Sequence, residues 1–338
     1  MGSLTDRARE LLPGIALLSG TALVASLVAG ALPVAGAVLP AVLIGALVAN
    51  AVGVPARAEP GVRLHKLLLE TGIVLMGARI SLSEVTATGP RLVALVAGTV
   101  AVGLALAELL SRAVFGLTDR IGSLIAAGAS VCGVSAVVAV AGSIDAEEEH
   151  VAYAVATVLL FDAVTLVAFP IAGGLGGVPP KVFGVWAGLS MFSTGPVAAA
   201  GFAYSEVAGQ WATLTKLVRN SFIGVVAVAY SVYYLRDSES GRTCRSRLSE
   251  LWDGFPKFLV GFLLVALAAN AGAIPAAGIP LLNRASDALF VLAFAGLGFD
   301  VRAAAMRRAG LSPVLVALVH LLVMGALTLA AASLLLAP

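Results

Sequence analysis

The chain has 338 residues, of which 60% are hydrophobic and 12% are charged, and its formal net charge is +2. A mean hydropathy of +1.02 excludes an ordinary soluble domain, and so small a net charge gives no reason to expect a nucleic-acid partner. Cys132 lies in an apolar stretch and Cys244 in a charged segment, so the two cysteines indicate no disulfide framework. The composition predicts an all-α polytopic membrane protein whose main surroundings are the lipid bilayer.

Apolar runs bounded by charged residues, proline or glycine predict about eleven transmembrane helices. Backbone amides find no water in lipid, so every crossing must be helical. The first uncharged stretch, residues 11–56, is too long for one crossing, and Pro33, Gly36 and Pro40 divide it into two helices. The predicted helices cover residues 12–33, 37–53, 65–82, 92–113, 121–143, 151–173, 182–204, 213–235, 255–273, 286–301 and 312–336.

Lysine and arginine gather on one side of these helices if successive helices alternate in direction. The basic clusters begin at Arg7, Arg57, Arg112, Lys181, Arg236 and Arg302. The positive-inside rule makes this side the cytoplasm of a cell membrane, with the N-terminus cytoplasmic and the C-terminus external for eleven helices. We expect one integrated membrane domain, with helices 1 to 8 in residues 1–235, a cytoplasmic loop at 236–254 and helices 9 to 11 in 255–338.

An internal echo relates two distant segments. Residues 47–55 (LVANAVGVP) and 267–275 (LAANAGAIP) place Asn50 and Asn270 at matching positions, and each segment precedes a helix that ends in a glycine-bearing turn. The second and ninth predicted helices run in opposite directions, which indicates an inverted repeat of the kind found in secondary transporters. A five-plus-five division, helices 2 to 6 against 7 to 11, also gives opposite orientations. Chance likeness between small-residue membrane helices is the alternative.

The fifth predicted helix carries hydroxyls, a thiol and a glycine in mid-membrane, at Ser130, Cys132, Gly133 and Ser135. Such a stretch can unwind, so that backbone N–H groups and a helix N-terminus are free to hold an anion. The alternative is a continuous helix packed through small residues, with each serine bonded back to the preceding turn.

The seventh predicted helix has a similar composition, with hydroxyl residues and a glycine in an apolar stretch. Its candidate solute-binding residues are Ser190, Ser193, Thr194 and Gly195. Pro196 follows them and lacks a backbone donor, which predicts free carbonyls around Phe192. Two breakable helices in one protein favour a binding site formed by interrupted helices.

Ionisable and amide side chains inside predicted helices are the next candidates. Asp162 lies in the middle of the sixth helix, where desolvation favours its neutral form, so it is the candidate carrier of a coupling proton; the alternative is a carboxyl held by a neighbouring hydroxyl. Lys216 and Arg219 lie one helical step apart and either pair with an anionic solute or extend to the membrane interface. Asn50 and Asn270, with backbone carbonyls, are candidate ligands of a coupling Na⁺.

The sequence contains no P-loop, HExxH motif, cysteine–histidine cluster or nucleophile elbow. We therefore expect neither an enzyme nor a cofactor, and no metal site.

Five segments together resemble the sulfate exporter family of bacterial and archaeal inner-membrane proteins. They are residues 68–82 (LLETGIVLMGARISL), 126–136 (AAGASVCGVSA), 147–157 (EEEHVAYAVAT), 197–209 (VAAAGFAYSEVAG) and 213–219 (TLTKLVR). The resemblance implies a fold like that of cation/proton antiporters and bile-acid symporters, with two inverted five-helix repeats and discontinuous helices that cross at the centre. The chain departs from the family pattern at residues 191–196 and at Asp162, where a glycine is usual.

By this resemblance Ser130, Cys132, Gly133 and Ser135 fall on the first crossing helix, and Lys216 and Arg219 on a retained basic motif. The predicted function is secondary active transport of a small anion, such as sulfate, sulfite or an organosulfonate, by alternating access with proton coupling. The alternatives are a Na⁺-coupled symporter of an organic anion, a passive anion channel and a membrane sensor that does not transport. The oligomeric state, including a homo-oligomer, stays open.

Overall fold

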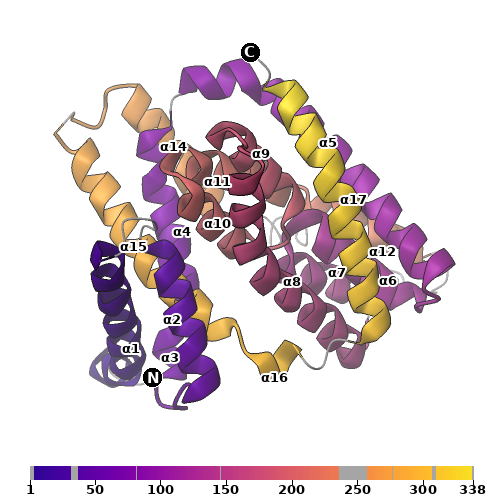
Figure 1. The fold of residues 1–338 in the computed structure, drawn as a ribbon, viewed down its shortest axis with the longest axis horizontal. Helices are drawn as coiled ribbons and strands as arrows, with labels where there is room; N and C mark the ends of the chain where they lie inside the picture. Colours follow the sequence, from indigo (N-terminus) through magenta and orange to yellow (C-terminus); the bar gives the residue numbers. More distant parts are fainter. Residues whose placement is uncertain are drawn as a thin grey trace. The chain divides into compact units, whose positions relative to one another are not determined.

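The computed structural model describes residues 4–31, 37–80, 82–144, 146–235, 257–275, 277–306 and 310–336. Every regular element within these ranges is a helix, which confirms the all-α prediction (Figure 1). Six described stretches are helical, long and apolar enough to cross a membrane, and the count of eleven crossings stays a prediction. The six stretches are Glu10–Gly30, Gly89–Val114, Glu148–Leu175, Glu206–Tyr234, Ile279–Asp300 and Leu311–Leu335.

Several helices begin earlier than the sequence predicted, and for two of them a cap or a proline explains the early start. Helix α11 (Glu206–Asn220) begins seven residues before the predicted start because Ser205 caps it, its Oγ accepting a hydrogen bond of 3.1 Å from the Ala208 N–H. A turn at residues 221–222 then separates α11 from α12 (Ile223–Leu235). Helix α15 (Ile279–Asp300) also begins seven residues early, with a proline in its first turn.

The chain forms two compact units, and each contains segments from both halves of the sequence. Unit 1 comprises residues 1–87 and 257–303, and unit 2 comprises residues 88–256 and 304–338. The predicted cytoplasmic loop at residues 236–254 lies outside the described residues.

Unit 1 is built mainly on α15, which packs against two helices from the N-terminal part of the chain, α2 and α4; α14 packs against α4 and the 3₁₀ turn η1. Its elements are α1 (Leu4–Ala31), α2 (Val38–Ala51), α3 (Glu59–Val62), α4 (His65–Met76), η1 (Gly77–Arg79), α14 (Phe258–Asn270) and α15.

Two close approaches in unit 1 repeat each other. Gly77 lies against the Phe262 carbonyl of α14, and Gly298 of α15 lies against the Val42 carbonyl of α2, so closely that a Cβ at either glycine would overlap backbone. Gly77 and Gly298 are 221 positions apart, and Val42 and Phe262 are 220 apart. The spacing matches that of the echo in the sequence.

The asparagines of the echo make matching contacts beside these glycines. Asn50 Nδ2 donates to the Val301 carbonyl at 2.7 Å, and Asn270 Nδ2 donates to the Ile80 carbonyl at 2.9 Å. Each amide thus satisfies a carbonyl at the end of the helix that follows the other asparagine in the chain. Asn50 Oδ1 also accepts from the Ala303 N–H at 2.8 Å.

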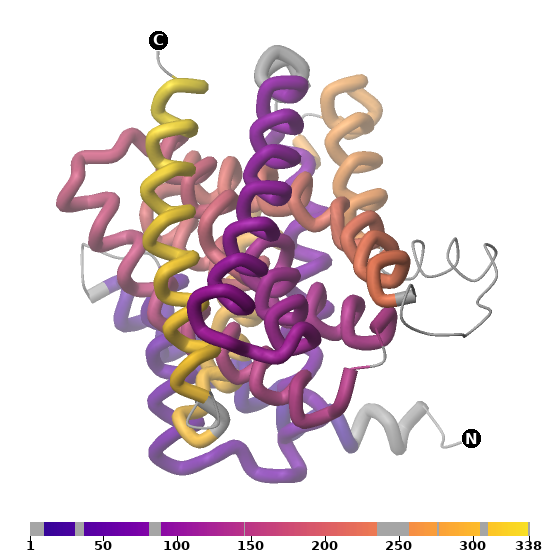
Figure 2. The backbone as a smooth tube through the Cα atoms, turned by 90° about the vertical axis from the view of Figure 1, so that its right-hand side faces the viewer, coloured from indigo at the N-terminus to yellow at the C-terminus, as the bar shows by residue number. Residues whose placement is uncertain are grey.

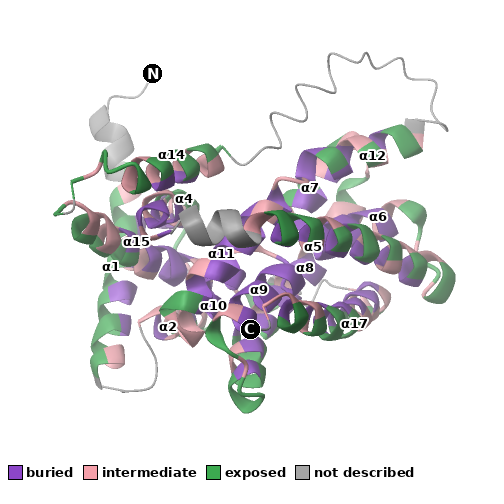
Figure 3. Cartoon of the chain, turned by 90° about the horizontal axis from the view of Figure 1, so that it is seen from above, coloured by how far each residue is buried: buried purple, intermediate pink, exposed green. Residues whose placement is uncertain are grey.

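Helices α9 and α11 form the core of unit 2, and most of their residues are buried (purple in Figure 3). Helix α11 packs against α9 and α10. Helices α5 and α17 run side by side (Figure 2) and keep exposed apolar faces. The elements of unit 2 are α5 (Leu82–Leu109, from residue 88), the π-helix η2 (Leu110–Val114), α6 (Asp119–Ala127), the π-helix η3 (Gly128–Cys132), α7 (Val134–Ser143), α8 (Glu148–Leu175), α9 (Pro180–Ser190), α10 (Thr194–Tyr204), α11, α12, α16 (Ala303–Met306, from residue 304) and α17 (Leu311–Leu335).

Candidate solute site at two helix breaks

The first break interrupts the fifth predicted helix at Gly133. Helix α6 continues into the π-helical segment η3, and α7 begins at Val134. Gly133 has φ 66° and ψ −134°, a conformation that residues with a side chain rarely adopt. The helix is therefore interrupted and not continuous, which is one of the two alternatives that the sequence left open, and Gly133 permits the break.

The second break interrupts the seventh predicted helix between α9 and α10. Met191 has φ −71° and ψ 154°, and Ser193 has φ −100° and ψ 152°, so the chain is extended here. Pro196 lies in the first turn of α10, where its missing N–H has no helical partner to lose. This helix too is interrupted.

The two breaks meet. A Cβ at Gly133 would overlap Ser193 Oγ, so the starts of α7 and α10 lie against each other. The first N–H groups of a helix have no partner within the helix, so the junction brings together main-chain N–H groups from the starts of two helices. Ser135 is exposed and Ser193 and Thr194 are half-buried, whereas Gly195 is buried, so the junction is accessible from one side.

Lys216 lies on the opposite, buried side of both breaks. Its Nζ donates to the carbonyls of Val131 at 2.9 Å and Met191 at 3.1 Å, and also to that of Phe192. One ammonium group therefore joins the end of η3 to the end of α9. The carbonyl of Phe192 is indeed free of helical bonding, as Pro196 predicts.

Arg219, three residues after Lys216 on α11, also donates hydrogen bonds to carbonyls of both interrupted helices. Its Nε donates to Ser130 O at 2.7 Å, its Nη1 to Met191 O at 2.8 Å and Gly188 O at 3.3 Å, and its Nη2 to Ala129 O. Cations at helix C-termini oppose the negative end of the helix dipole. Arg219 thus stabilises both interrupted helices where they end.

The two cations are buried within the protein. Lys216 is 0% and Arg219 1% exposed, so neither side chain extends to the protein surface. The carbonyls already use all three Lys216 donors and four hydrogen bonds of Arg219. Their action on a solute anion stays a prediction, and in this geometry it would come from their charge.

Asp162 on α8 lies at the start of α10. It is 6% exposed, and its Oδ1 accepts a hydrogen bond of 3.0 Å from the Ser193 N–H. The carboxylate therefore occupies the place that an anion would take at a helix N-terminus. Its role as proton carrier stays a prediction.

Asn220 is a residue that the sequence analysis missed. It is 4% exposed, and its Nδ2 donates to Thr194 Oγ1 at 2.9 Å. Asn220 Oδ1 and Ser193 Oγ are buried atoms without a hydrogen-bond partner in the described part of the chain. Its position four residues after Lys216, on the same face of α11, is the sequence signal that could have found it.

The remaining candidates are placed as follows. Cys132 is buried in η3 directly before the first break. Ser130 lies three residues before Gly133, and Ser190 is the last residue of α9, three residues before Ser193. Asn50 and Asn270 belong to unit 1, where they bond to helix ends, and their role as Na⁺ ligands stays a prediction. Among the described residues, no group of three or more His, Cys, Asp or Glu side chains could hold a metal ion.

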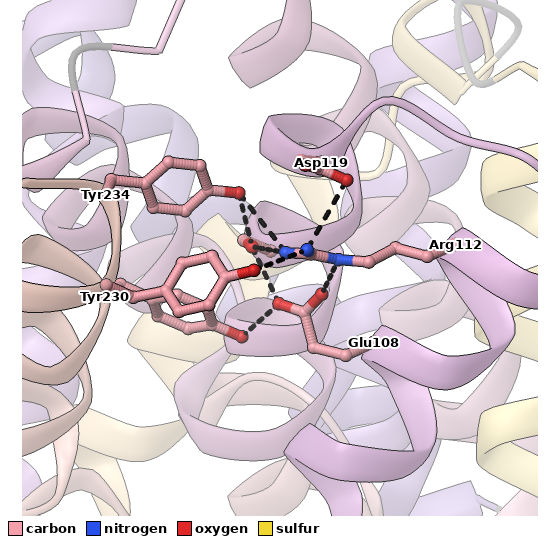
Figure 4. A network of polar contacts seen from close by, with 7 residues as sticks. Glu108, Arg112, Asp119, Tyr230 and Tyr234 are labelled. Carbon is pink, nitrogen blue, oxygen red and sulfur yellow. Dashed lines mark hydrogen bonds and ion pairs between the residues drawn. The ribbon is translucent and has the colours of Figure 1, made fainter. Parts of the chain in front are cut away.

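A separate polar network ties the first half of the first broken helix to its neighbours (Figure 4). Glu108 on α5 accepts hydrogen bonds from Arg112 Nε at 2.6 Å, Ser123 Oγ at 2.7 Å and Tyr230 OH at 2.7 Å. Because these partners come from η2, α6 and α12, one carboxylate connects four elements.

Arg112 extends this network. Its Nη1 lies 3.0 Å from Tyr233 OH and 3.4 Å from Asp119 Oδ1, and Tyr234 OH lies 3.0 Å from Ser123 Oγ. The sequence did not single out Glu108, because its partners lie up to 122 residues away in the chain. The network thus connects α6, the helix that leads to the first break, to its neighbours.

An all-helical membrane protein with two interrupted helices is the class that these features define. The chain belongs to the family described as conserved hypothetical protein 698, which matches residues 13–317. It is 33% identical over 315 residues to a UPF0324 membrane protein of Nitratidesulfovibrio vulgaris, covering 90% of this chain and 87% of that protein.

A second relative, a UPF0324 membrane protein of Agrobacterium fabrum, is 32% identical over 294 residues, covering 87% of this chain and 82% of that protein. A third, from Pseudomonas aeruginosa, is 33% identical over 286 residues, covering 82% and 80%. No solved structure matches the chain significantly. The comparisons confirm a family of membrane proteins.

Proposed function

We propose that this protein is a secondary active transporter that moves a small anion across the cytoplasmic membrane by alternating access. The observation that carries the proposal is the junction of the two breaks, where the starts of α7 and α10 meet at Gly133 and Ser193. Interrupted helices whose N-termini point at an anionic group are a recurrent way to bind solutes at mid-membrane.

The charges at the junction favour an anion. Lys216, Arg219 and Asp162 are all at least nine-tenths buried, and in their ordinary ionised forms they leave one net positive charge. Buried charge is costly unless it is compensated, so a bound anion would bring the site to neutrality. A sulfur oxyanion or organosulfonate, which the family resemblance implies, fits this charge and the hydroxyls of Ser193 and Thr194.

Asp162 links the anion to a proton. While it is ionised, its carboxylate holds the Ser193 N–H and repels a second anion at the start of α10. Proton uptake would remove that charge and free the donor for the solute. Proton and anion would therefore bind together and cross together.

The repeated contacts of unit 1 support alternating access. Two halves related by offsets of 220 and 221 residues exchange equivalent contacts through Asn50 and Asn270, as inverted repeats of transporters do. Together with the eleven predicted helices, they favour two five-helix repeats with a cytoplasmic N-terminus.

A thermal-shift screen tests the anion directly. Purified protein is melted with sulfate, sulfite, thiosulfate, taurine or carboxylates, each as both sodium and choline or potassium salts. A ligand at a hundred to a thousand times its dissociation constant should stabilise the protein by about 3–4 kcal/mol. Stabilisation that follows the anion supports the proposal. If Na⁺ stabilises the protein and none of the anions does, the proposal that the solute is an anion is wrong.

Replacing Asp162 by asparagine separates binding from coupling. Asparagine is neutral like the protonated acid, so it does not repel a bound anion, but it cannot take up a proton. We therefore expect anion-dependent thermal stabilisation to persist while proton-driven uptake falls to background. Proteoliposomes with an imposed pH gradient measure the uptake. Undiminished proton-driven transport by Asp162→Asn would take Asp162 out of the mechanism.

Na⁺ coupling is a second candidate because of one observation, the buried and unpartnered Asn220 Oδ1. Amide, hydroxyl and carboxylate oxygens are ligands for hard cations, and Asn220, Thr194 and Asp162 all adjoin the start of α10. Uptake that depends on Na⁺ and ignores the pH gradient would favour it. A passive channel would give flux that does not saturate, and a sensor would bind anions without flux.

A further inference from the structure

Helix α17 contacts both interrupted helices from one face. His320 Nε2 lies 3.4 Å from Ser130 Oγ, and Thr328 Oγ1 lies 2.6 Å from Ser190 Oγ. Between them, the Gly325 carbonyl accepts a hydrogen bond of 2.8 Å from Trp186 Nε1 of α9. His320 and Thr328 are eight residues apart, which places them on the same side of a helix.

The two serines hold equivalent places. Ser130 lies three residues before the break at Gly133, and Ser190 lies three residues before Ser193. Thr328 donates its own hydrogen to the Met324 carbonyl at 2.5 Å, so in the short contact with Ser190 the serine is the donor. Ser190 therefore donates its hydroxyl hydrogen to Thr328 of α17.

The contact at Ser130 is enclosed. A Cβ on Gly103 of α5 would lie 3.0 Å from Ser130 Oγ and 3.3 Å from His320 Nε2, so α5 covers the pair without a gap. His320 is 2% and Thr328 2% exposed. Both contacts therefore lie within the protein, on the side of the breaks away from the accessible starts of α7 and α10.

We propose that α17 is a clamp that positions both breaks, with His320 and Thr328 as its positioning residues. Because one helix holds the last turn before each break, the two interrupted helices keep a fixed mutual placement and shift as one body. Ser130 and Ser190 then position the two breaks through their contacts with α17 and do not bind the solute themselves. The inference rests on the proposed function only where solute transport is the readout.

Thiol labelling of Cys132 tests the clamp without transport. Cys132 is 4% exposed in η3, two residues after Ser130, so its modification by N-ethylmaleimide requires the first break to open. A Cys244→Ser background leaves it as the only thiol. Loss of one buried hydrogen bond should favour opening, so His320→Leu should raise the labelling rate about five- to tenfold.

Conservative variants separate a positioning contact from general destabilisation. His320→Gln can place an amide near the position of Nε2 and should label at the rate of the background protein. Thr328→Ser keeps the hydroxyl that Ser190 contacts, whereas Thr328→Val removes it. Ser333 is exposed on the same helix, so Ser333→Ala is the matched control and should leave labelling unchanged.

The clamp predicts that Thr328→Val also speeds labelling of Cys132, although Thr328 contacts the other break. Wild-type labelling rates in both His320→Leu and Thr328→Val would overturn the clamp, and so would failure of His320→Gln to restore protection. A protein that labels as expected but moves no anion would overturn the proposed transport and leave the clamp standing.

Discussion

Lys216→Met should destabilise unit 2 by about 2–5 kcal/mol, because it leaves the carbonyls of Val131 and Phe192 buried without a donor at about 1–3 kcal/mol each. The carbonyl of Met191 keeps its bond from Arg219. Methionine has a similar length and apolar stem, so the change removes charge and donors while largely filling the space. Thermal unfolding of the purified protein in detergent measures the loss.

Lys66→Met is the matched control because Lys66 is exposed, and its melting temperature should stay within about a degree or two of the wild-type value, as surface substitutions usually do. Anion-dependent stabilisation should also disappear in Lys216→Met, since the net positive charge of the junction is lost. An unchanged melting temperature for Lys216→Met would show that the bonds to the two breaks contribute nothing to stability.

Gly133→Ala has the second large expected effect. The backbone at φ 66° and ψ −134° is strained for alanine by about 1–3 kcal/mol, and the added methyl group would also overlap Ser193 Oγ. We expect a lower melting temperature together with loss of anion-dependent stabilisation, because the starts of α7 and α10 would be forced apart.

Gly142→Ala is the control in the same helix. Gly142 is exposed in α7 and has open space where a Cβ would go, so alanine should be neutral or stabilise by up to about 1 kcal/mol. Adding Ser193→Gly to Gly133→Ala removes the overlap but leaves the backbone strain, so it should restore part of the lost stability. Equal behaviour of Gly133→Ala and Gly142→Ala would contradict the proposed geometry.

Local signals explain why both breaks could be predicted from the sequence. Gly133 permits a backbone that other residues avoid, and Pro196 fits the first turn of a new helix. Both effects depend on neighbouring residues alone. The unexpected start at Glu206 depended on a local cap too, at Ser205, but the glycine and polar residues that follow it concealed the helix.

Contacts between distant segments explain what the sequence did not reveal. Lys216 and Arg219 were recognised as costly charges, but their carbonyl partners lie 24 to 90 residues away in the chain. The contacts of His320 and Thr328 could not be predicted, because a polar residue on an apolar helix does not show in the sequence which residue it will contact. Asn50 and Asn270 were paired by their sequence surroundings, but only the folded unit shows that each donates a hydrogen bond to the end of the helix that follows the other.

Uptake of a radiolabelled sulfur oxyanion into proteoliposomes, with and without an imposed proton gradient, tests the transport claim most directly. We expect uptake that saturates with concentration, rises with the gradient and falls to background in Gly133→Ala, while Gly142→Ala transports normally. Flux that grows linearly with concentration and ignores the gradient, or anion binding without any flux, would contradict it.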